Sequence, residues 1–111
     1  MCMKELVGRF YQEFFNEHDI SSAEKYVRED YIQHNPGLDQ GRRGLMEAFA
    51  EKFKVMPDFR LEIEMMIAEG DLIAVYLKNI DPAGNIRARV VDIYRIEDGM
   101  LAEHWDVIQR F

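Results

Sequence analysis

The sequence is short of the features that mark secretion, membrane insertion and nucleic-acid binding. Its single cysteine, Cys2, cannot form an internal disulfide, so we expect a reducing, cytoplasmic setting. No apolar run approaches the roughly 18 residues that a membrane-spanning helix needs, and the charged, amphipathic N-terminus does not resemble a signal peptide. Acidic residues outnumber basic ones, 21 to 14, and the net charge of −7 argues against a phosphate-binding surface. We therefore expect neither a membrane nor a nucleic acid as a partner.

Markers of several catalytic chemistries are missing as well. No serine or cysteine lies near the C-terminal stretch that carries the candidate site, which argues against an acyl-enzyme mechanism. No His-x-His or His-Glu-x-x-His spacing is present. His34, His104 and one aspartate would make a two-His-one-carboxylate set, but without such spacing we predict no metal ion.

Hydrophobic spacing predicts three helices in the first half of the chain. The first covers residues 3–17 and the third covers residues 45–53, each with one apolar stripe. Between them, Ser21 and Glu24 match a capping box, which predicts a short helix over 21–27. All three helices would pack their apolar stripes on one core.

The second half of the chain is predicted to form strands. Residues 31–37 break helical periodicity and end in a Pro-Gly turn, and the strand patterns begin after the third helix. They lie at residues 59–68, 72–78, 86–96 and 100–109. The buried face of the first is predicted as Phe59, Leu61, Ile63, Met65 and Ile67. Short turns join all four, so we expect an antiparallel meander with helices on one side, an α+β domain spanning 1–111.

The last two predicted strands form a hairpin whose apolar pattern is interrupted by Asp92, His104 and Asp106. If Glu97-Asp98-Gly99 is a three-residue loop with its glycine at positive φ, Asp92 faces His104 and all three polar side chains share one face. A two-residue type I′ turn would instead pair Asp92 with Trp105 and split it from Asp106. We favour the three-residue loop, with the two-residue turn as the alternative.

The face that carries these polar groups is otherwise mostly apolar, which is typical of a small-molecule pocket. A buried ionised carboxylate is costly unless it is paired or hydrated. An Asp–His pair in such a site forms an acid/base unit suited to a carbonyl compound or a water molecule, and a structural ion-pair network is the alternative. The opposite face is apolar too, and we expect it to pack against a second copy of the chain through Val91, Ile93, Trp105 and Val107.

Two segments resemble the SnoaL-like branch of the nuclear transport factor 2-like superfamily. They are Tyr31-Ile32-Gln33-His34-Asn35-Pro36, which precedes a helix that begins with glycine, and the stretch from Val91 to Val107. The resemblance implies a cone-shaped roll, with three helices on a strongly curved antiparallel sheet of four or more strands around a deep pocket, in a homodimer. Members include polyketide cyclases, ketosteroid isomerases, epoxide hydrolases and dehydratases, generally without a cofactor. The chain ends at Phe111, so we expect it to lack the tail that often closes the pocket.

The resemblance also suggests roles for particular residues. Asp92 or Asp106 is the expected acid/base residue, with His34 and His104 polarising the substrate or orienting that carboxylate. The candidate substrate-binding residues are Tyr11, Phe14, Asn35, Tyr76 and Tyr94. Limonene epoxide hydrolases have an arginine where this chain has Val90, which argues against their Asp-Arg-Asp mechanism.

These features lead to two functional expectations. The first is a cofactor-free enzyme that performs aldol cyclisation, isomerisation or hydration–dehydration on a small, mostly apolar carbonyl compound. The alternative is a non-catalytic ligand-binding or dimerisation module of the same fold.

Overall fold

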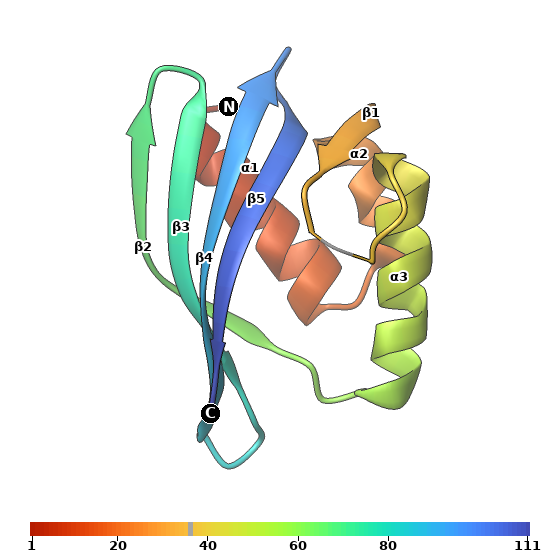
Figure 1. Ribbon diagram of the computed structural model, residues 1–111, viewed down its shortest axis with the longest axis vertical. Coiled ribbons are helices and arrows are strands. Elements are labelled where there is room, and N and C mark those ends of the chain that lie inside the picture. The colour runs from red at the N-terminus through yellow and green to blue at the C-terminus, as the bar shows by residue number, and fades with distance from the viewer. Residues whose placement is uncertain (36) are drawn as a thin grey trace.

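The computed structural model describes residues 1–35 and 37–111, with helices on one side of a curved sheet (Figure 1). Its helices are α1 (Met3–Phe10), α2 (Ala23–Tyr26) and α3 (Gly41–Val55). Its strands are β1 (Val27–Gln33), β2 (Leu61–Glu69), β3 (Leu72–Ile80), β4 (Ile86–Glu97) and β5 (Met100–Arg110). A π-helical segment, Tyr11–Asn16, continues α1, and a 3-10 turn, Ile20–Ser22, precedes α2. None of the described helices has the length and hydropathy needed to cross a membrane.

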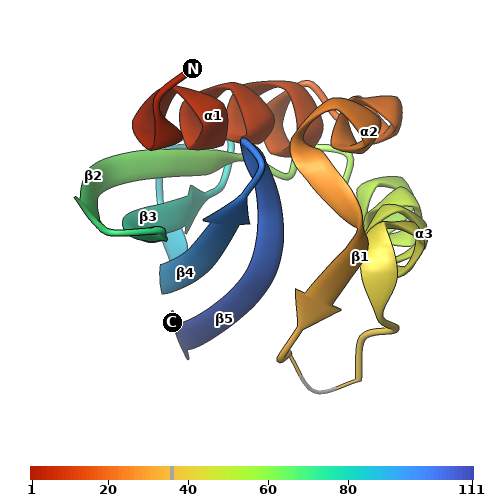
Figure 2. The same cartoon turned by 90° about the horizontal axis from the view of Figure 1, so that it is seen from above.

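The sheet follows the order β1-β5-β4-β3-β2, with β1 parallel to β5 and every other pair antiparallel. Figure 2 shows the strands curling beneath α1, with α3 at the end of the sheet near β1. The predicted α+β fold, with helices on a strongly curved sheet, is confirmed. The sheet is mixed and has five strands, because β1 adds a strand that the sequence pattern did not predict.

Strand β1 corrects two predictions. The short second helix ends at Tyr26, and Ser21 bonds the Asp19 carboxylate at 2.6 Å and does not cap a helix. Residues 31–33, predicted to be irregular, belong to β1. Its register with β5 is also irregular, with Val27 opposite Leu101 and Ile32 opposite Glu103. A parallel pairing between such distant segments leaves no turn signal in the sequence.

Strand β2 follows the predicted pattern only in its first half. A β-bulge between Ile63 and Met65 inserts one extra residue, which sends the following side chains to the opposite face. Met65 and Ile67, predicted to be buried, are therefore 52% and 65% exposed on the outer face, whereas Met66 packs against the core. The bulge thus makes the outer face more apolar.

The core lies between the first helix and β3. Phe10 and Phe14 stack with their ring centroids 5.1 Å apart, and both are almost fully buried. Ile73, Val75 and Leu77 cover them from the inner face of β3. Burial of each of these large apolar side chains contributes roughly 1.5–3 kcal/mol. This core closes one half of the concave face, and the other half, beneath α3, remains open as a cavity.

Candidate active site

The turn between β4 and β5 differs from the favoured prediction. Asp98 and Gly99 have φ values of +53° and +73°, and Glu97 pairs with Met100 across them. Two central residues with positive φ define a type I′ hairpin, so the loop has two residues and the three-residue prediction is wrong. This turn alone would pair Asp92 with Trp105.

A β-bulge restores the predicted face. Ile96 pairs with Leu101, but Arg95 pairs with Glu103, so Ala102 is the extra residue. From there on Asp92 lies directly opposite Asp106, and Tyr94 lies opposite His104. One inserted residue changes the parity of the pairing, so the polar side chains share one face after all.

Cross-strand pairing arranges the inner face of β3, β4 and β5 in four rows. The rows are Ile73–Tyr94–His104, Val75–Asp92–Asp106, Leu77–Val90–Ile108 and Asn79–Ala88–Arg110. The acid/base candidates occupy the first two rows, and the third row is entirely apolar. The fourth row is polar again, with a basic side chain at one end.

His104 lies between the two carboxylates and is buried. Its Nε2 atom is 2.8 Å from Asp92 Oδ1 and 4.0 Å from Asp106 Oδ2, and its Nδ1 atom is 2.6 Å from Gln33 Oε1. Gln33 Oε1 also accepts a hydrogen bond from the backbone N–H of Asn35, which identifies it as the acceptor end of the amide. Both ring nitrogens of His104 therefore lie at hydrogen-bonding distance from an oxygen atom of another side chain.

Asp92 has a partner on each oxygen. Oδ1 bonds His104, and Oδ2 accepts a short hydrogen bond from the Tyr11 hydroxyl. The Tyr94 hydroxyl lies 2.8 Å from that of Tyr11 and can donate to it. Burial, reinforced by the charge of Asp92, raises the pKa of both tyrosines well above the usual value, so they remain protonated donors. Asp92 is therefore held on both sides.

Asp106 lines the cavity as Asp92 does, but only one of its two carboxylate oxygens has a hydrogen-bond partner in the described part of the chain. Its Oδ2 atom accepts a hydrogen bond from Asn35 Nδ2 at 2.8 Å, and its Oδ1 atom has no partner among the described residues. Burial raises the pKa of Asp106 from its usual value, and the charge of Asp92 adds to this. The positive charge of His104 and the bond from Asn35 oppose the shift without cancelling it.

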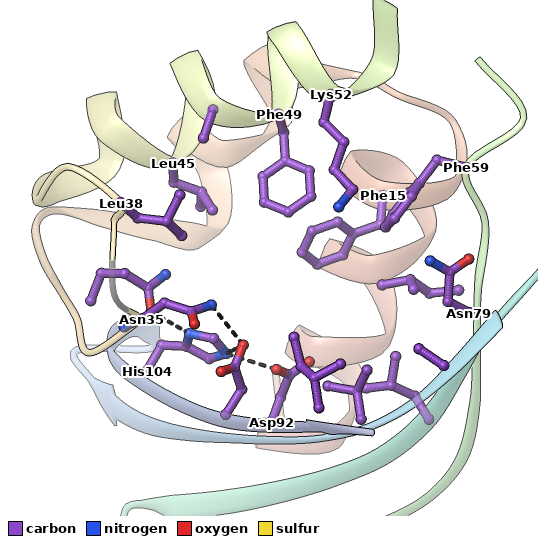
Figure 3. A pocket seen from close by; sticks show the side chains of 18 of the residues that line it. Phe15, Asn35, Leu38, Leu45, Phe49, Lys52, Phe59, Asn79, Asp92 and His104 are labelled. Carbon is purple, nitrogen blue, oxygen red and sulfur yellow. Dashed lines mark hydrogen bonds and ion pairs between the residues drawn. The ribbon is translucent and has the colours of Figure 1, made fainter. Parts of the chain in front are cut away.

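The cavity has a volume of about 370 Å³, which is within the range of small-molecule pockets. Figure 3 shows Asn35, Asp92 and His104 at one end, with Leu45 and Phe49 of α3 facing them across the cavity. The middle is apolar, with Phe15 and Leu77 among its walls. A ligand with an apolar body and polar groups at its ends would match this lining.

The structure brings most of the predicted site residues together. Asp92, His104, Asp106, Asn35 and Tyr94 line the cavity, and Tyr11 lies behind Asp92. Phe14, predicted as a substrate contact, is instead fully buried in the core, and its ring centroid lies 5.6 Å from that of Phe49. Core packing therefore accounts for Phe14.

His34 and Tyr76 lie on the outer face, away from the cavity. His34 Nε2 is 2.6 Å from Glu103 Oε2, and its ring stacks on Trp105 at 5.0 Å. Tyr76 accepts a bond from Arg89 at 3.2 Å and lines a shallow hollow in the outer face. His34 is excluded from the site because Gln33 and Asn35, on either side of it, point inward. Tyr76 points outward because its neighbours Val75 and Leu77 face the core.

Five of the lining residues that sequence reasoning missed have polar side chains: Tyr31, Gln33, Lys52, Asn79 and Arg110. The Gln33 side chain points to the face opposite that of its neighbour His34. The sequence indicates this only if β1 is recognised as a strand. Lys52 extends the helical stripe of Leu45, Ala48 and Phe49, so its position did indicate an inward side chain. Arg110 likewise continues the alternation of Asp106 and Ile108.

A cation is the alternative occupant of the polar cluster. The candidate ligand atoms of Asp92, His104 and Asp106 lie within 4.8 Å of one another. Hydrogen bonding already satisfies much of this set, since His104 Nε2 is at bonding distance from Asp92 and the Tyr11 hydroxyl occupies the other Asp92 oxygen. Hydrogen bonds therefore account for the placement of Asp92 and His104, and the bond from Asn35 holds Asp106.

The curved sheet and the helices that cover it have the nuclear transport factor 2-like fold, with a polar cavity between them. Residues 5–111 match the family model of the SnoaL-like polyketide cyclases, and the chain belongs to this family. No curated protein matches the chain.

Solved structures support the fold. TsrD from Streptomyces laurentii is 24% identical, with a TM-score of 0.81 over 96% of this chain and 87% of that one. A candidate polyketide cyclase from Bacillus cereus is 25% identical, with a TM-score of 0.81 over 94% and 72% of the two chains. IdmH from Streptomyces antibioticus is 20% identical, with a TM-score of 0.78 over 96% and 91%.

Proposed function

We propose that the chain is an enzyme that binds a small, mostly apolar carbonyl compound and uses Asp106 as its acid/base residue. The reaction class is aldol cyclisation, isomerisation or hydration–dehydration. The observation that carries the proposal is the difference between the two carboxylates. Asp92 is bonded on both oxygens, whereas Asp106 has one oxygen open to the cavity and a raised pKa. A general base needs a free oxygen within reach of the substrate proton.

Proton transfer would begin with the free oxygen of ionised Asp106. It would take a proton from the carbon next to the substrate carbonyl, and Tyr31 and Asn35 are the candidate donors to the enolate oxygen that develops. The raised pKa brings Asp106 closer to the working pH, so the protonated side chain can return the proton to another atom. No nucleophilic side chain is required for this step.

The other members of the cluster would position the reacting groups. Gln33 and Asp92 hold the His104 ring from both sides, and His104 Nε2 lies 4.0 Å from Asp106 Oδ2. The ring therefore lies beside both carboxylates, which face each other across neighbouring strands. The Tyr11 and Tyr94 hydroxyls would keep Asp92 in place.

Solvent deuterium exchange at the α-carbon of enolisable ketones, followed by NMR, tests the proposal without knowledge of the product. We expect Asp106→Asn to lower the exchange rate by about 10²–10⁴-fold, the usual contribution of a general base. Asp92→Asn should also lower it, by disturbing His104. Glu103→Gln, on the same strand but on the outer face, is the control and should exchange at the wild-type rate. An exchange rate that stays at the wild-type value in both aspartate variants would contradict the proposal.

A second candidate function is a non-catalytic ligand-binding module. Asp92, His104 and Tyr11 bond one another and Gln33, as the members of a structural network would. In that case the same substitutions would mainly lower stability, by about 1–3 kcal/mol for each orphaned partner, and leave ligand affinity nearly unchanged.

We further propose that the outer face packs against a second copy of the chain. Val91, Ile93, Trp105 and Val107 lie on that face, and Val107 is 72% exposed. The bulge in β2 adds Met65 and Ile67 to the same apolar surface. Exposed apolar area of this kind marks an interaction site.

A further inference from the structure

The end of the cavity remote from Asp106 carries basic side chains. In the fourth row of the inner face, Asn79 and Arg110 flank the small side chain of Ala88, and all three line the cavity. Figure 3 shows Lys52 reaching down from α3 toward this end, near Phe49 and Phe59, with Asn79 on the same side. The cavity is therefore acidic at one end and basic at the other.

The two basic side chains lack carboxylate partners although the chain has an excess of acidic residues. Eight of the 14 basic residues form ion pairs, for example Lys54 with Glu51 at 3.1 Å and Arg87 with Asp58 at 2.9 Å. Lys52 and Arg110 form no ion pair with any described residue. Burial lowers the pKa of Lys52, and the positive charge of Arg110 lowers it further. Both residues are exposed, so an anionic ligand group that enters the cavity could join these two like charges.

The neighbouring amide supports a polar ligand group at this end. Asn79 Oδ1 is buried and has no hydrogen-bond partner among the described residues. A buried polar atom without a partner costs about 1–3 kcal/mol. Because Asn79 Oδ1 is an acceptor, a donor such as the Lys52 ammonium or a ligand hydroxyl would satisfy it, and a carboxylate would not. The third row, Leu77–Val90–Ile108, separates this end from the acidic cluster by an apolar stretch.

We propose that the cavity binds carbonyl compounds that carry a carboxylate at the end remote from the reacting carbon, with Lys52 and Arg110 holding that carboxylate. The orientation of the ligand rests on the proposed role of Asp106. Arg110 lies four positions after Asp106 on the same strand, which places their Cα atoms about 13 Å apart. A substrate with an apolar ring or chain between its two functional groups fits this spacing.

Binding of δ-benzoylvaleric acid and of its methyl ester, measured by isothermal titration calorimetry, tests the proposal. The two probes share a ketone and an apolar body and differ only in the carboxylate. The wild-type protein should bind the acid about tenfold more tightly than the ester, as expected for charge-assisted hydrogen bonds. Lys52→Met and Arg110→Met should each lose most of this preference. Lys54→Met, on the same helix, is the matched control and should retain it.

Thermal melts would establish that each variant is folded before it is titrated. A wild-type protein that binds the acid no more tightly than the ester overturns the proposal. So does a Lys54→Met variant that loses as much preference as Lys52→Met. Asp106→Asn should keep the preference for the acid, because Asp106 lies at the other end. If Asp106→Asn also kept full exchange activity, the catalytic proposal would fail while the carboxylate proposal stood.

Discussion

Each face of the sheet carries a histidine bonded to a carboxylate, and the two pairs lie in different environments. On the inner face, His104 bonds Asp92, and the two side chains are 7% and 9% exposed. On the outer face, His34 bonds Glu103, and His34 is 42% exposed. The bonds to His34 and Arg95 lower the pKa of Glu103, whereas burial raises the pKa of Asp106 beside His104. Burial beneath the helices, more than residue type, makes the inner pair a candidate for acid/base chemistry.

The largest expected difference between the faces is in stability. His104→Leu would leave Asp92 and Gln33 buried without their partner, so we expect the free energy of unfolding to fall by about 3–5 kcal/mol. His34→Leu removes a partly exposed pair and should cost less than about 1 kcal/mol. Urea denaturation of both variants measures this. Equal losses would mean that the two faces do not differ in the way that burial implies.

The pH dependence of the free energy of unfolding is expected to be a smaller effect. Its sign should be opposite for Asp106 on the inner face and Glu103 on the outer face. The raised pKa of folded Asp106 means that its stability contribution falls as pH rises from the ordinary value of 3.8 through the folded pKa. Asp106→Asn should therefore unfold less readily than wild type at pH 7. The lowered pKa of Glu103 contributes stability that is present above its ordinary value of 4.5 and is lost as pH falls through the folded pKa.

Glu103→Gln should accordingly lower the free energy of unfolding at pH 7. Both differences should shrink toward acidic pH, where wild-type carboxyl groups are protonated. Urea denaturation across the pH range checks the two directions. If Asp106→Asn were less stable than wild type at pH 7, the buried carboxylate would be part of a stabilising network, as the non-catalytic alternative requires.

Substitutions on the outer face are expected to have the smallest effect on ligand binding in the cavity. Ile67→Glu places a charge on the proposed dimer surface, so sedimentation should show a shift from dimer to monomer. Ile67 is exposed, and its substitution should leave probe binding in the cavity unchanged. Ile67→Thr, which adds a polar group without a charge, serves as the control and should shift the equilibrium less. A wild-type protein that sediments as a monomer would contradict the dimer proposal.

Periodicity predicted the elements whose signals are local. The first helix, α3 and the four strands β2 to β5 lie close to their predicted ranges, because each buries a regular stripe or alternates along its own length. β1 escaped prediction because its partner, β5, lies some seventy positions away, as the pairing of Gln33 with His104 shows. The bulges in β2 and β5 were not predicted either. A bulge changes how two strands pair, and the sequence of one strand does not show that change.

The candidate site shows the same division. The grouping of Asp92, His104 and Asp106 was predicted from a hairpin register that is wrong, and it holds because the unpredicted bulge at Ala102 restores the parity that the two-residue turn had reversed. Gln33 was missed and His34 was chosen in its place. These neighbours point to opposite sides of one strand, and only the pairing of β1 with β5 decides which side faces the cavity.

The sequence by itself determined the α+β class, the apolar stripes and the presence of three polar groups in an apolar hairpin. Those properties depend on short-range periodicity, which the order of residues contains in full. The tertiary structure alone decided that Asp106 keeps a free oxygen while Asp92 does not, and that Lys52 and Arg110 face the same cavity. Both outcomes arise from contacts between segments far apart in the chain, and these contacts exist only once the sheet has curled beneath the helices.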